Sequence, residues 1–289
     1  MESRDSRFII RDDANDPLGI LRSTAGVMRT ARDVQIDIGA VSRVADDLEG
    51  GDAAPQWDAE LHYRATGPDG DEHTAMWILV LDTLNFCFWG QGTDPDVRWR
   101  VEWRGELVDG YVALVAALTR AVESGVPLHD ARFLVHVDDD TVGAILAPSG
   151  AHPPIPLLAE RGRNLRELGR GLLDLESNAP ATALIECAKG SAIALVREVV
   201  QRFSSFNDVA TWPRAETGLP GNEVRFYKRA QILAGDLAGG LAGSPLGDLH
   251  DLDGLTAFAD YKVPQMLRHL DVPPSSAIYT VTIHEAVPI

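Results

Sequence analysis

The pattern of apolar positions predicts a chain built mostly from helices. A segment that begins near Thr74 is apolar on most sides and therefore predicts a central, buried helix. From Tyr111 onward, apolar residues recur at helical spacing, and glycine or proline stands at most of the boundaries. The helices that this pattern predicts cover residues 111–124, 130–137, 141–147, 156–175, 181–203, 226–242 and 255–270.

Two stretches lie between the helix predicted from Thr74 onward and the helix predicted over residues 111–124, and both alternate with the period of a β-strand. Apolar side chains occupy every second position at Phe86 and Phe88 and again within residues 99–103. Residues 90–96 between them are rich in turn formers, so we expect an antiparallel hairpin with an aromatic face. The sequence therefore predicts a mostly α fold with a small antiparallel β hairpin or sheet.

The two ends of the chain and its loops complete this outline. Capped helical segments are predicted within residues 8–50, a loop within 211–222 and a short strand within 277–283. A hydrophobic content of 45% is ample for a packed core. Because no linker is long enough to divide the chain, we expect residues 1–289 to form a single domain.

Charge and hydropathy limit the partners. The chain has 43 acidic and 26 basic residues, a net charge of −17, which argues against extended contact with a nucleic acid backbone. No window approaches the roughly 20 apolar residues that span a bilayer. The first residues, Met1 to Asp5, lack the apolar core of a secretory signal. We therefore expect a cytoplasmic protein without a membrane or nucleic acid partner.

Cysteine and histidine, the residue types that most often bind zinc, are scattered along the sequence. The two cysteines, Cys87 and Cys187, form neither a disulfide framework nor a zinc-ligand spacing. The eight histidines show no pairing at metal-ligand distance along the chain and no nucleophile motif nearby. The sequence predicts no metal site and no cofactor.

Two segments carry the most informative candidate chemistry. Residues 226–233 form the start of an apolar helix that bears Lys228 and Arg229, and residues 255–265 place Asp260 between apolar neighbours. A lysine and a carboxylate separated by a glycine-rich connection can converge in one cleft. Cleavage of a glycosidic bond can use such a pair.

These two segments, with residues 82–89 upstream, resemble the signature blocks of the queuosine salvage protein family. Further matches occur at residues 110–121, 125–127, 156–161 and 205–208, and the resemblance runs in order from about Asp12 to Gln265. Members of this family are hydrolases that release the 7-deazaguanine base queuine from queuosine 5′-phosphate. The resemblance implies this reaction, without a cofactor, in the salvage of queuine for tRNA modification.

The resemblance also implies roles for the lysine and the acid. Breaking an N-glycosidic bond develops positive charge on the ribose, and a carboxylate near the anomeric carbon stabilises it by Coulomb attraction or by covalent capture. Asp260 is the residue expected in that role. Lys228 is expected to assist, either by binding the 5′-phosphate or by positioning Asp260.

Substrate-binding residues follow from the same resemblance. Aromatic rings can stack on a flat deazaguanine base, while carboxylates accept hydrogen bonds from its N–H groups. Lys262 stands where many family members have arginine, so a phosphate contact there keeps its charge but loses bidentate geometry. The expected substrate-binding residues are Asn85, Phe86, Phe88, Trp89, Phe206, Asp208, Tyr227, Arg229, Tyr261 and Lys262.

Two other readings stay open. The chain departs from the family after Leu270 and has a short C-terminus, which would suit a queuine-binding protein that has lost turnover. A lysine on a helix ahead of an acid also resembles the helix-hairpin-helix DNA glycosylases, although their glycine-spaced hairpin is absent before Lys228. This second resemblance implies a helical, DNA-glycosylase-like architecture, whereas base excision from DNA would need a basic surface.

Overall fold

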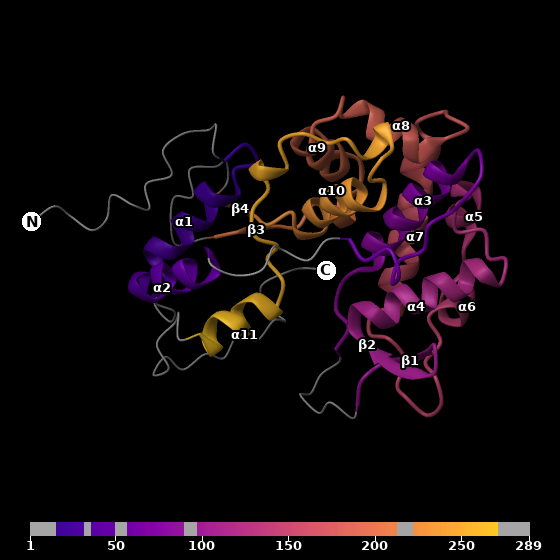
Figure 1. The fold of residues 1–289 in the computed structure, drawn as a ribbon, viewed down its shortest axis with the longest axis horizontal. Helices are drawn as coiled ribbons and strands as arrows, with labels where there is room; N and C mark the ends of the chain where they lie inside the picture. The colour runs from indigo at the N-terminus through magenta and orange to yellow at the C-terminus, as the bar shows by residue number, and fades with distance from the viewer. Residues whose placement is uncertain (1–15, 32–35, 50–56, 90–96, 213–221, 271–289) are drawn as a thin grey trace, which may run out of the picture. The chain divides into compact units, whose positions relative to one another are not determined.

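The computed structural model describes residues 16–31, 36–49, 57–89, 97–212 and 222–270. The described chain is mostly helical with small antiparallel sheets, the fold class that the sequence pattern predicts (Figure 1). It contains two sheets of two strands each, where the sequence predicts one small hairpin or sheet. It forms two compact units, each assembled from segments far apart in the sequence. The first unit comprises Met1–Pro55, Asp208–Gln231 and Asp253–Ile289, and the second comprises Gln56–Asn207 and Ile232–Leu252. The single domain expected from the sequence stays a prediction.

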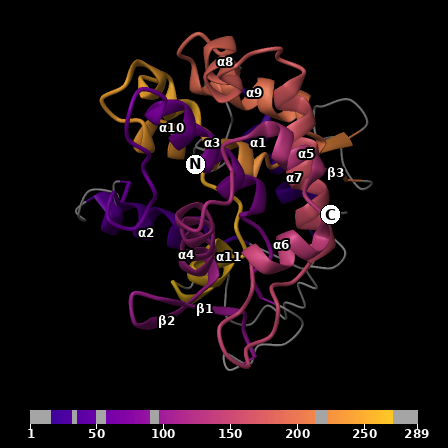
Figure 2. The ribbon, with the colours of Figure 1, turned by 90° about the vertical axis from the view of Figure 1, so that its right-hand side faces the viewer.

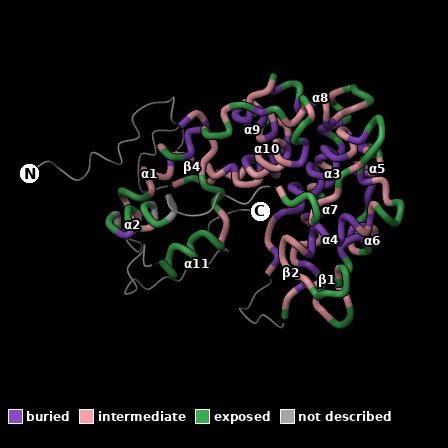
Figure 3. The backbone as a smooth tube through the Cα atoms, in the orientation of Figure 1, coloured by how far each residue is buried: buried purple, intermediate pink, exposed green. Residues whose placement is uncertain are grey.

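The second unit is a helical assembly around one buried helix. Helix α3 (Gly70–Leu84) is buried at every position from Thr74 onward, which confirms the central helix predicted there (Figure 3). The helices of this unit are α3, α4 (Gly110–Glu123), α5 (Ala131–His136), α6 (Asp139–Ile145), α7 (Leu158–Leu173), α8 (Pro180–Cys187), α9 (Ala192–Arg202) and most of α10 (Lys228–Gly240). Burial of so many apolar side chains is the main force that assembles such a unit.

One predicted helix is two helices in the structure. The pattern predicts a single helix over residues 181–203, but Lys189 and Gly190 have φ angles of 51° and 79° and separate α8 from α9. A left-handed backbone ends an α-helix, and glycine adopts it without strain. The Ser191 side chain then accepts a hydrogen bond from the Ala194 N–H and caps α9.

The hairpin in the structure begins one strand later in the sequence than the predicted hairpin. Strand β1 (Arg100–Trp103) pairs with β2 (Glu106–Asp109), not with the stretch around Phe86 and Phe88, so that part of the prediction is wrong. Arg104 and Gly105 have positive φ angles of 51° and 85°, which suits the tight two-residue turn that joins twisted strands. The stretch around Phe86 instead turns its carbonyl groups toward a buried arginine, described below. The expected turn at 90–96 lies outside the described residues.

The first unit contains the helices α1 (Ile20–Thr30), α2 (Ile38–Glu49) and α11 (Lys262–His269). The first two confirm the helices predicted within residues 8–50. A small sheet of β3 (Val209–Thr211) and β4 (Glu223–Arg225) was not predicted, because its short strands flank the loop expected at 211–222. Helix α11 begins later than the predicted helix over 255–270. The strand predicted at 277–283 lies outside the described residues.

Close packing of α5 against α7 depends on one glycine (Figure 2). A Cβ atom added to Gly169 of α7 would lie 2.6 Å from the Val135 backbone nitrogen and 2.8 Å from the Ala131 oxygen. Backbone atoms cannot swing aside as a side chain can. The two helices can therefore approach this closely only with glycine at position 169.

Replacing Gly169 by alanine should lower the free energy of unfolding by about 1–3 kcal/mol, since overpacking outweighs the better helix propensity of alanine. Gly143→Ala in α6 is the matched control, because its Cβ would meet only the Leu158 Cδ2 atom at 3.5 Å. Urea denaturation of the two variants measures the difference. A Gly169→Ala protein as stable as Gly143→Ala would show that α5 and α7 do not pack this closely.

Candidate active site

The first unit brings the predicted lysine and aspartate into direct contact. The Lys228 Nζ atom lies 3.0 Å from the Asp260 Oδ2 atom, and their side chains are 13% and 28% exposed. Lys228 is the first residue of α10, and Asp260 lies two residues before α11 begins. The two residues are 32 positions apart in the sequence, so tertiary folding creates this ion pair.

The local sequence around Asp260 orients its carboxylate. The Oδ1 atom accepts a hydrogen bond from the Lys262 N–H at 2.9 Å, which forms an Asx turn at the start of α11. Pro264 fits in the first turn of that helix, where its missing N–H leaves no bond unmade. One carboxylate oxygen therefore holds the backbone and the other faces Lys228.

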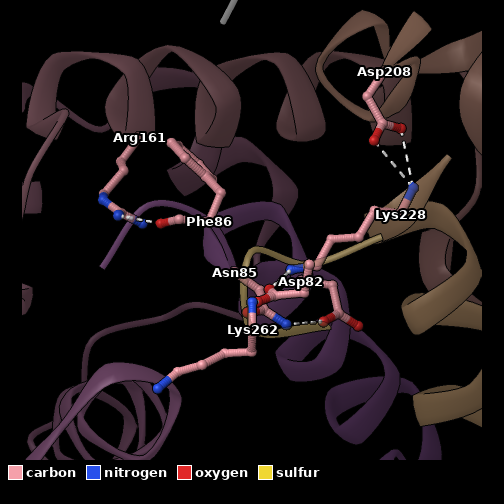
Figure 4. Close-up of polar contacts among 8 residues, drawn as sticks. Asp82, Asn85, Phe86, Arg161, Asp208, Lys228 and Lys262 are labelled. Atoms are coloured by element: carbon pink, nitrogen blue, oxygen red, sulfur yellow. Dashed lines mark hydrogen bonds and ion pairs between the residues drawn. The ribbon is translucent and has the colours of Figure 1, made fainter. Parts of the chain in front are cut away.

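Asp208 binds the start of the helix that carries Lys228. Both of its carboxylate oxygens accept a hydrogen bond from the Lys228 backbone N–H at 3.1 Å (Figure 4). Burial raises the pKa of the Asp208 carboxyl to about 6, against the hydrogen bond from Lys228 and the charge of Arg229, which both lower it. The side chain predicted to bind the base thus also caps α10.

The other predicted residues of the first unit surround this pair along the chain. Tyr227 is buried, has a φ angle of 48° and lies under the Arg225 guanidinium, which is 5.9 Å from its ring centroid. Tyr261 directly precedes α11, and Lys262 begins that helix with an exposed side chain. The first unit thus contains seven predicted site residues: Asp208, Tyr227, Lys228, Arg229, Asp260, Tyr261 and Lys262.

The other five predicted residues belong to the second unit and differ in exposure. Phe88 and Phe206 are 6% and 1% exposed, so their rings are part of the core. Phe86 and Trp89 are only partly buried, and the Arg98 guanidinium lies 4.3 Å from the Trp89 ring centroid. Buried Asn85 donates through Nδ2 to the Asp82 Oδ1 atom at 3.3 Å.

Sequence reasoning gave no role to Arg161, which holds the backbone of residues 84–87. This arginine of α7 is fully buried, and its guanidinium donates to the carbonyl groups of Leu84, Phe86 and Cys87. Figure 4 shows the bond to Phe86. The same group lies 4.3 Å from the Phe86 ring centroid. The planar fork of five N–H groups satisfies several carbonyl oxygens at once, so it can stabilise an irregular backbone.

A chain of hydrogen bonds in the second unit was also not predicted. The His62 Nε2 atom lies 2.9 Å from the Tyr111 hydroxyl oxygen, and that hydroxyl is hydrogen bonded to Asp236. Burial, together with the negative charges of Asp236 and Asp82, raises the pKa of Tyr111. Two cavities of about 430 and 530 Å³ adjoin His62. The periodicity of apolar residues cannot predict these hydrogen bonds, because His62, Tyr111 and Asp236 come from separate segments.

Neither a metal-ligand cluster nor a membrane-spanning helix occurs in the described ranges. Within them, histidine, cysteine and acidic side chains form no group of three or more that could hold a metal ion. None of the described helices combines the length and apolarity needed to cross a bilayer.

An aspartate bound by a lysine at a helix start, as in this mostly helical protein, is a group that can stabilise a developing positive charge. Comparison with known proteins is more specific. The family described as "Queuosine salvage protein" matches residues 61–285. The chain therefore belongs to the queuosine salvage protein family.

Several relatives carry the same name, "Queuosine 5′-phosphate N-glycosylase/hydrolase". The protein from Sphaerobacter thermophilus is 47% identical over 90% of this chain and 75% of its own length. The protein from Bos taurus is 37% identical over 84% of this chain and 69% of its own length. The protein from Schizosaccharomyces pombe is 32% identical over 87% of this chain and 73% of its own length.

The raised pKa of Asp208 predicts a pH dependence of stability. Between about pH 4 and 6 the folded protein keeps a proton that the unfolded chain loses, so this contribution is present at low pH and is lost as pH rises through 6. Asp208→Asn, which keeps one acceptor oxygen for the Lys228 N–H, should lack this loss. From pH 4 to pH 7, the variant should gain about 2–3 kcal/mol of unfolding free energy relative to the wild type.

Urea denaturation of both proteins at the two pH values tests this prediction. All other carboxylates are common to the two proteins, so their titration cancels in the comparison. A constant difference in unfolding free energy at pH 4 and pH 7 would mean that Asp208 titrates as a solvated carboxyl group.

Proposed function

We propose that this chain hydrolyses the N-glycosidic bond of queuosine 5′-phosphate and releases queuine for salvage into tRNA modification. Membership of the queuosine salvage family and the names of the relatives support this substrate. The observation that carries the proposal is the contact between the Lys228 Nζ and Asp260 Oδ2 atoms at 3.0 Å. It supplies a negative charge, held in a defined orientation, for a cationic transition state.

In this mechanism Asp260 acts on the ribose. As the bond to the base breaks, electrons leave with the base and positive charge develops at the anomeric carbon. The Asp260 carboxylate stabilises that charge or captures the carbon covalently, and water completes the hydrolysis. Lys228 assists by fixing the carboxylate, since its ammonium group is bound to Asp260 in the structure.

The aromatic residues proposed to bind the base fall into two groups that differ in burial. The rings of Phe88 and Phe206 are enclosed in the core, so they support the site through packing. Phe86 and Trp89 are only partly buried and are the better candidates for stacking. Asp208, which lies in the same unit as Lys228 and Asp260, is the candidate for hydrogen bonds to the N–H groups of the base.

The protein that we propose is a cytoplasmic enzyme that needs neither a metal nor another cofactor and has no nucleic acid partner. Its net charge of −17 supports the last point, because a phosphate backbone attracts a basic surface. A single 5′-phosphate needs only one or two local cations. Arg229 and Lys262, in the two segments that carry the ion pair, are candidates for that contact.

The central experiment incubates the pure protein with queuosine 5′-phosphate and measures free queuine, with EDTA present in a parallel reaction. The wild type should release queuine with or without EDTA. Asp260→Asn keeps the shape of the side chain but removes its charge, so kcat should fall by about 100-fold or more while the nucleotide still binds. Chromatography measures queuine, and calorimetry measures binding.

The control for this variant is its melting temperature, which should stay close to that of the wild type. Binding of queuine without any turnover by the wild type would favour the alternative of a binding protein. Base release from duplex DNA would favour the DNA glycosylase alternative. Near-normal turnover by a folded Asp260→Asn protein would transfer the role to another carboxylate.

Phosphate recognition gives a second prediction. The nucleotide should have a kcat/KM at least about tenfold above that of the nucleoside queuosine, as expected for one hydrogen bond to a charged group. Lys262→Gln should reduce this preference. Lys189→Gln is the matched control, since Lys189 is an exposed lysine between α8 and α9 that is not among the expected site residues. Equal kcat/KM values of the wild type for nucleotide and nucleoside would contradict phosphate recognition.

A further inference from the structure

Gln231 connects the two segments that carry the candidate chemistry. It lies on the first turn of α10 and is fully buried. Its Nε2 atom donates to the Phe226 carbonyl oxygen at 3.0 Å. Its Oε1 atom accepts from the Thr256 N–H at 2.8 Å and from the Thr256 hydroxyl at 3.2 Å. One side chain thus binds the segment before Lys228 and the segment before Asp260.

The segment that carries Asp260 has little regular structure to hold it. In the described structure, residues 255–260 form neither helix nor strand, and Ala257, Phe258 and Ala259 are exposed. An ion pair that remains partly exposed contributes little on its own to ordering a flexible backbone. A buried amide with partners on both segments is better suited to that task, because leaving its polar atoms unpaired is unfavourable.

The segment before Lys228 also needs support. Tyr227 has a φ angle of 48°, which an L-residue seldom adopts, and it directly precedes the first residue of α10. Gln231 binds this turn twice, because its backbone N–H donates to the Tyr227 oxygen at 2.9 Å and its side chain binds Phe226. Gln231 therefore helps to set the position from which the Lys228 side chain extends.

We propose that Gln231 is a positioning residue, which holds Lys228 and Asp260 at the separation that catalysis requires. This inference rests on the proposed function for its kinetic consequence, but the geometry that it predicts can be measured without any assay. Gln231 touches neither the substrate nor the reacting atoms in this scheme. Its loss should therefore act on turnover and leave substrate affinity nearly unchanged.

The test compares Gln231→Met, which keeps the volume of the side chain and removes its hydrogen bonds, with the wild type. Misplacement of a catalytic group by about 1 Å can lower a rate by about 100-fold. We expect kcat on queuosine 5′-phosphate to fall about 10–100-fold, with KM changed less than about threefold. All assays are run at a temperature where circular dichroism shows each protein to be folded.

Ser23→Ala is the matched control. Ser23 is also fully buried in the first unit and bridges two segments, since its hydroxyl donates to Ile20 and accepts from the Arg225 N–H at 3.1 Å. Its hydroxyl binds Ile20 and Arg225, whereas the Gln231 side chain binds Phe226 and Thr256, so only Gln231→Met breaks a link to the segment that carries Asp260. A loss of stability alone should affect both variants alike, whereas a positioning role should lower kcat only in Gln231→Met.

Thr256→Val supplies a milder variant and a double-mutant cycle. It removes the hydroxyl bond to Gln231 and keeps the backbone bond, so kcat should fall about 2–10-fold at unchanged KM. In the Gln231→Met background the same change should have a much smaller effect, because only the longer contact of the hydroxyl with the Ala257 carbonyl oxygen, at 3.5 Å, remains. Should Gln231→Met fail to fold, an unaltered kcat of Thr256→Val would overturn the inference.

A crystal structure of Gln231→Met separates this inference from the proposed function. We expect the distance between the Lys228 Nζ and Asp260 Oδ2 atoms to exceed 4 Å, and a distance that stays near 3.0 Å would overturn the inference. A wild type that cleaves queuosine 5′-phosphate, with a normal kcat for Gln231→Met, would also overturn it and leave the proposed function standing. An inactive wild type would refute the proposed function, while the crystal structures still decide the geometry.

Discussion

The ion pair between Lys228 and Asp260 is the interaction on which the candidate chemistry depends. It joins the first residue of one helix to a residue just before another, 32 positions away. A pair that is partly exposed contributes little to stability, typically about 0–1 kcal/mol. Its proposed importance is therefore chemical, and other interactions must fix the backbone on both sides of it. Asp208 and Gln231 do so for α10, and the Asx turn of Asp260 does so for α11.

Both units use a buried polar side chain to hold irregular backbone. Arg161 donates to carbonyl groups along residues 84–87 of the second unit, and Gln231 binds Phe226 and Thr256 in the first. In both cases the stabilised stretch adjoins residues that the family resemblance implies for substrate binding, Asn85 and Phe86 in the second unit and Tyr227 in the first. Irregular backbone can aim side chains in directions that a helix does not allow, but its polar groups need partners when water is excluded. Each of these side chains supplies such partners from a rigid helix.

Asp208 illustrates how burial and capping act on one carboxyl group in opposite directions. Desolvation raises its pKa to about 6, whereas the N–H of Lys228 and the charge of Arg229 lower it. A helix start favours a negative charge, so the cap and the charged state support each other. The pKa near 6 leaves the group ionised at neutral pH, in the form that can accept hydrogen bonds from a base. Structural and proposed binding roles are thus compatible in one side chain.

The sequence by itself determined the helical class, the central helix α3 and most helix positions, because apolar periodicity and caps are local signals. The resemblance of its motif blocks to the queuosine salvage family also pointed to Lys228 and Asp260 as candidate catalytic residues. Only the tertiary structure decided that β1 pairs with β2, that Lys189 and Gly190 divide a predicted helix, and that Asp208 caps α10. The hydrogen bonds of Arg161 and Gln231 could not be predicted from the sequence either. Their partners are carbonyl and N–H groups of distant segments, which every residue carries, so no residue pattern identifies them before the chain is folded.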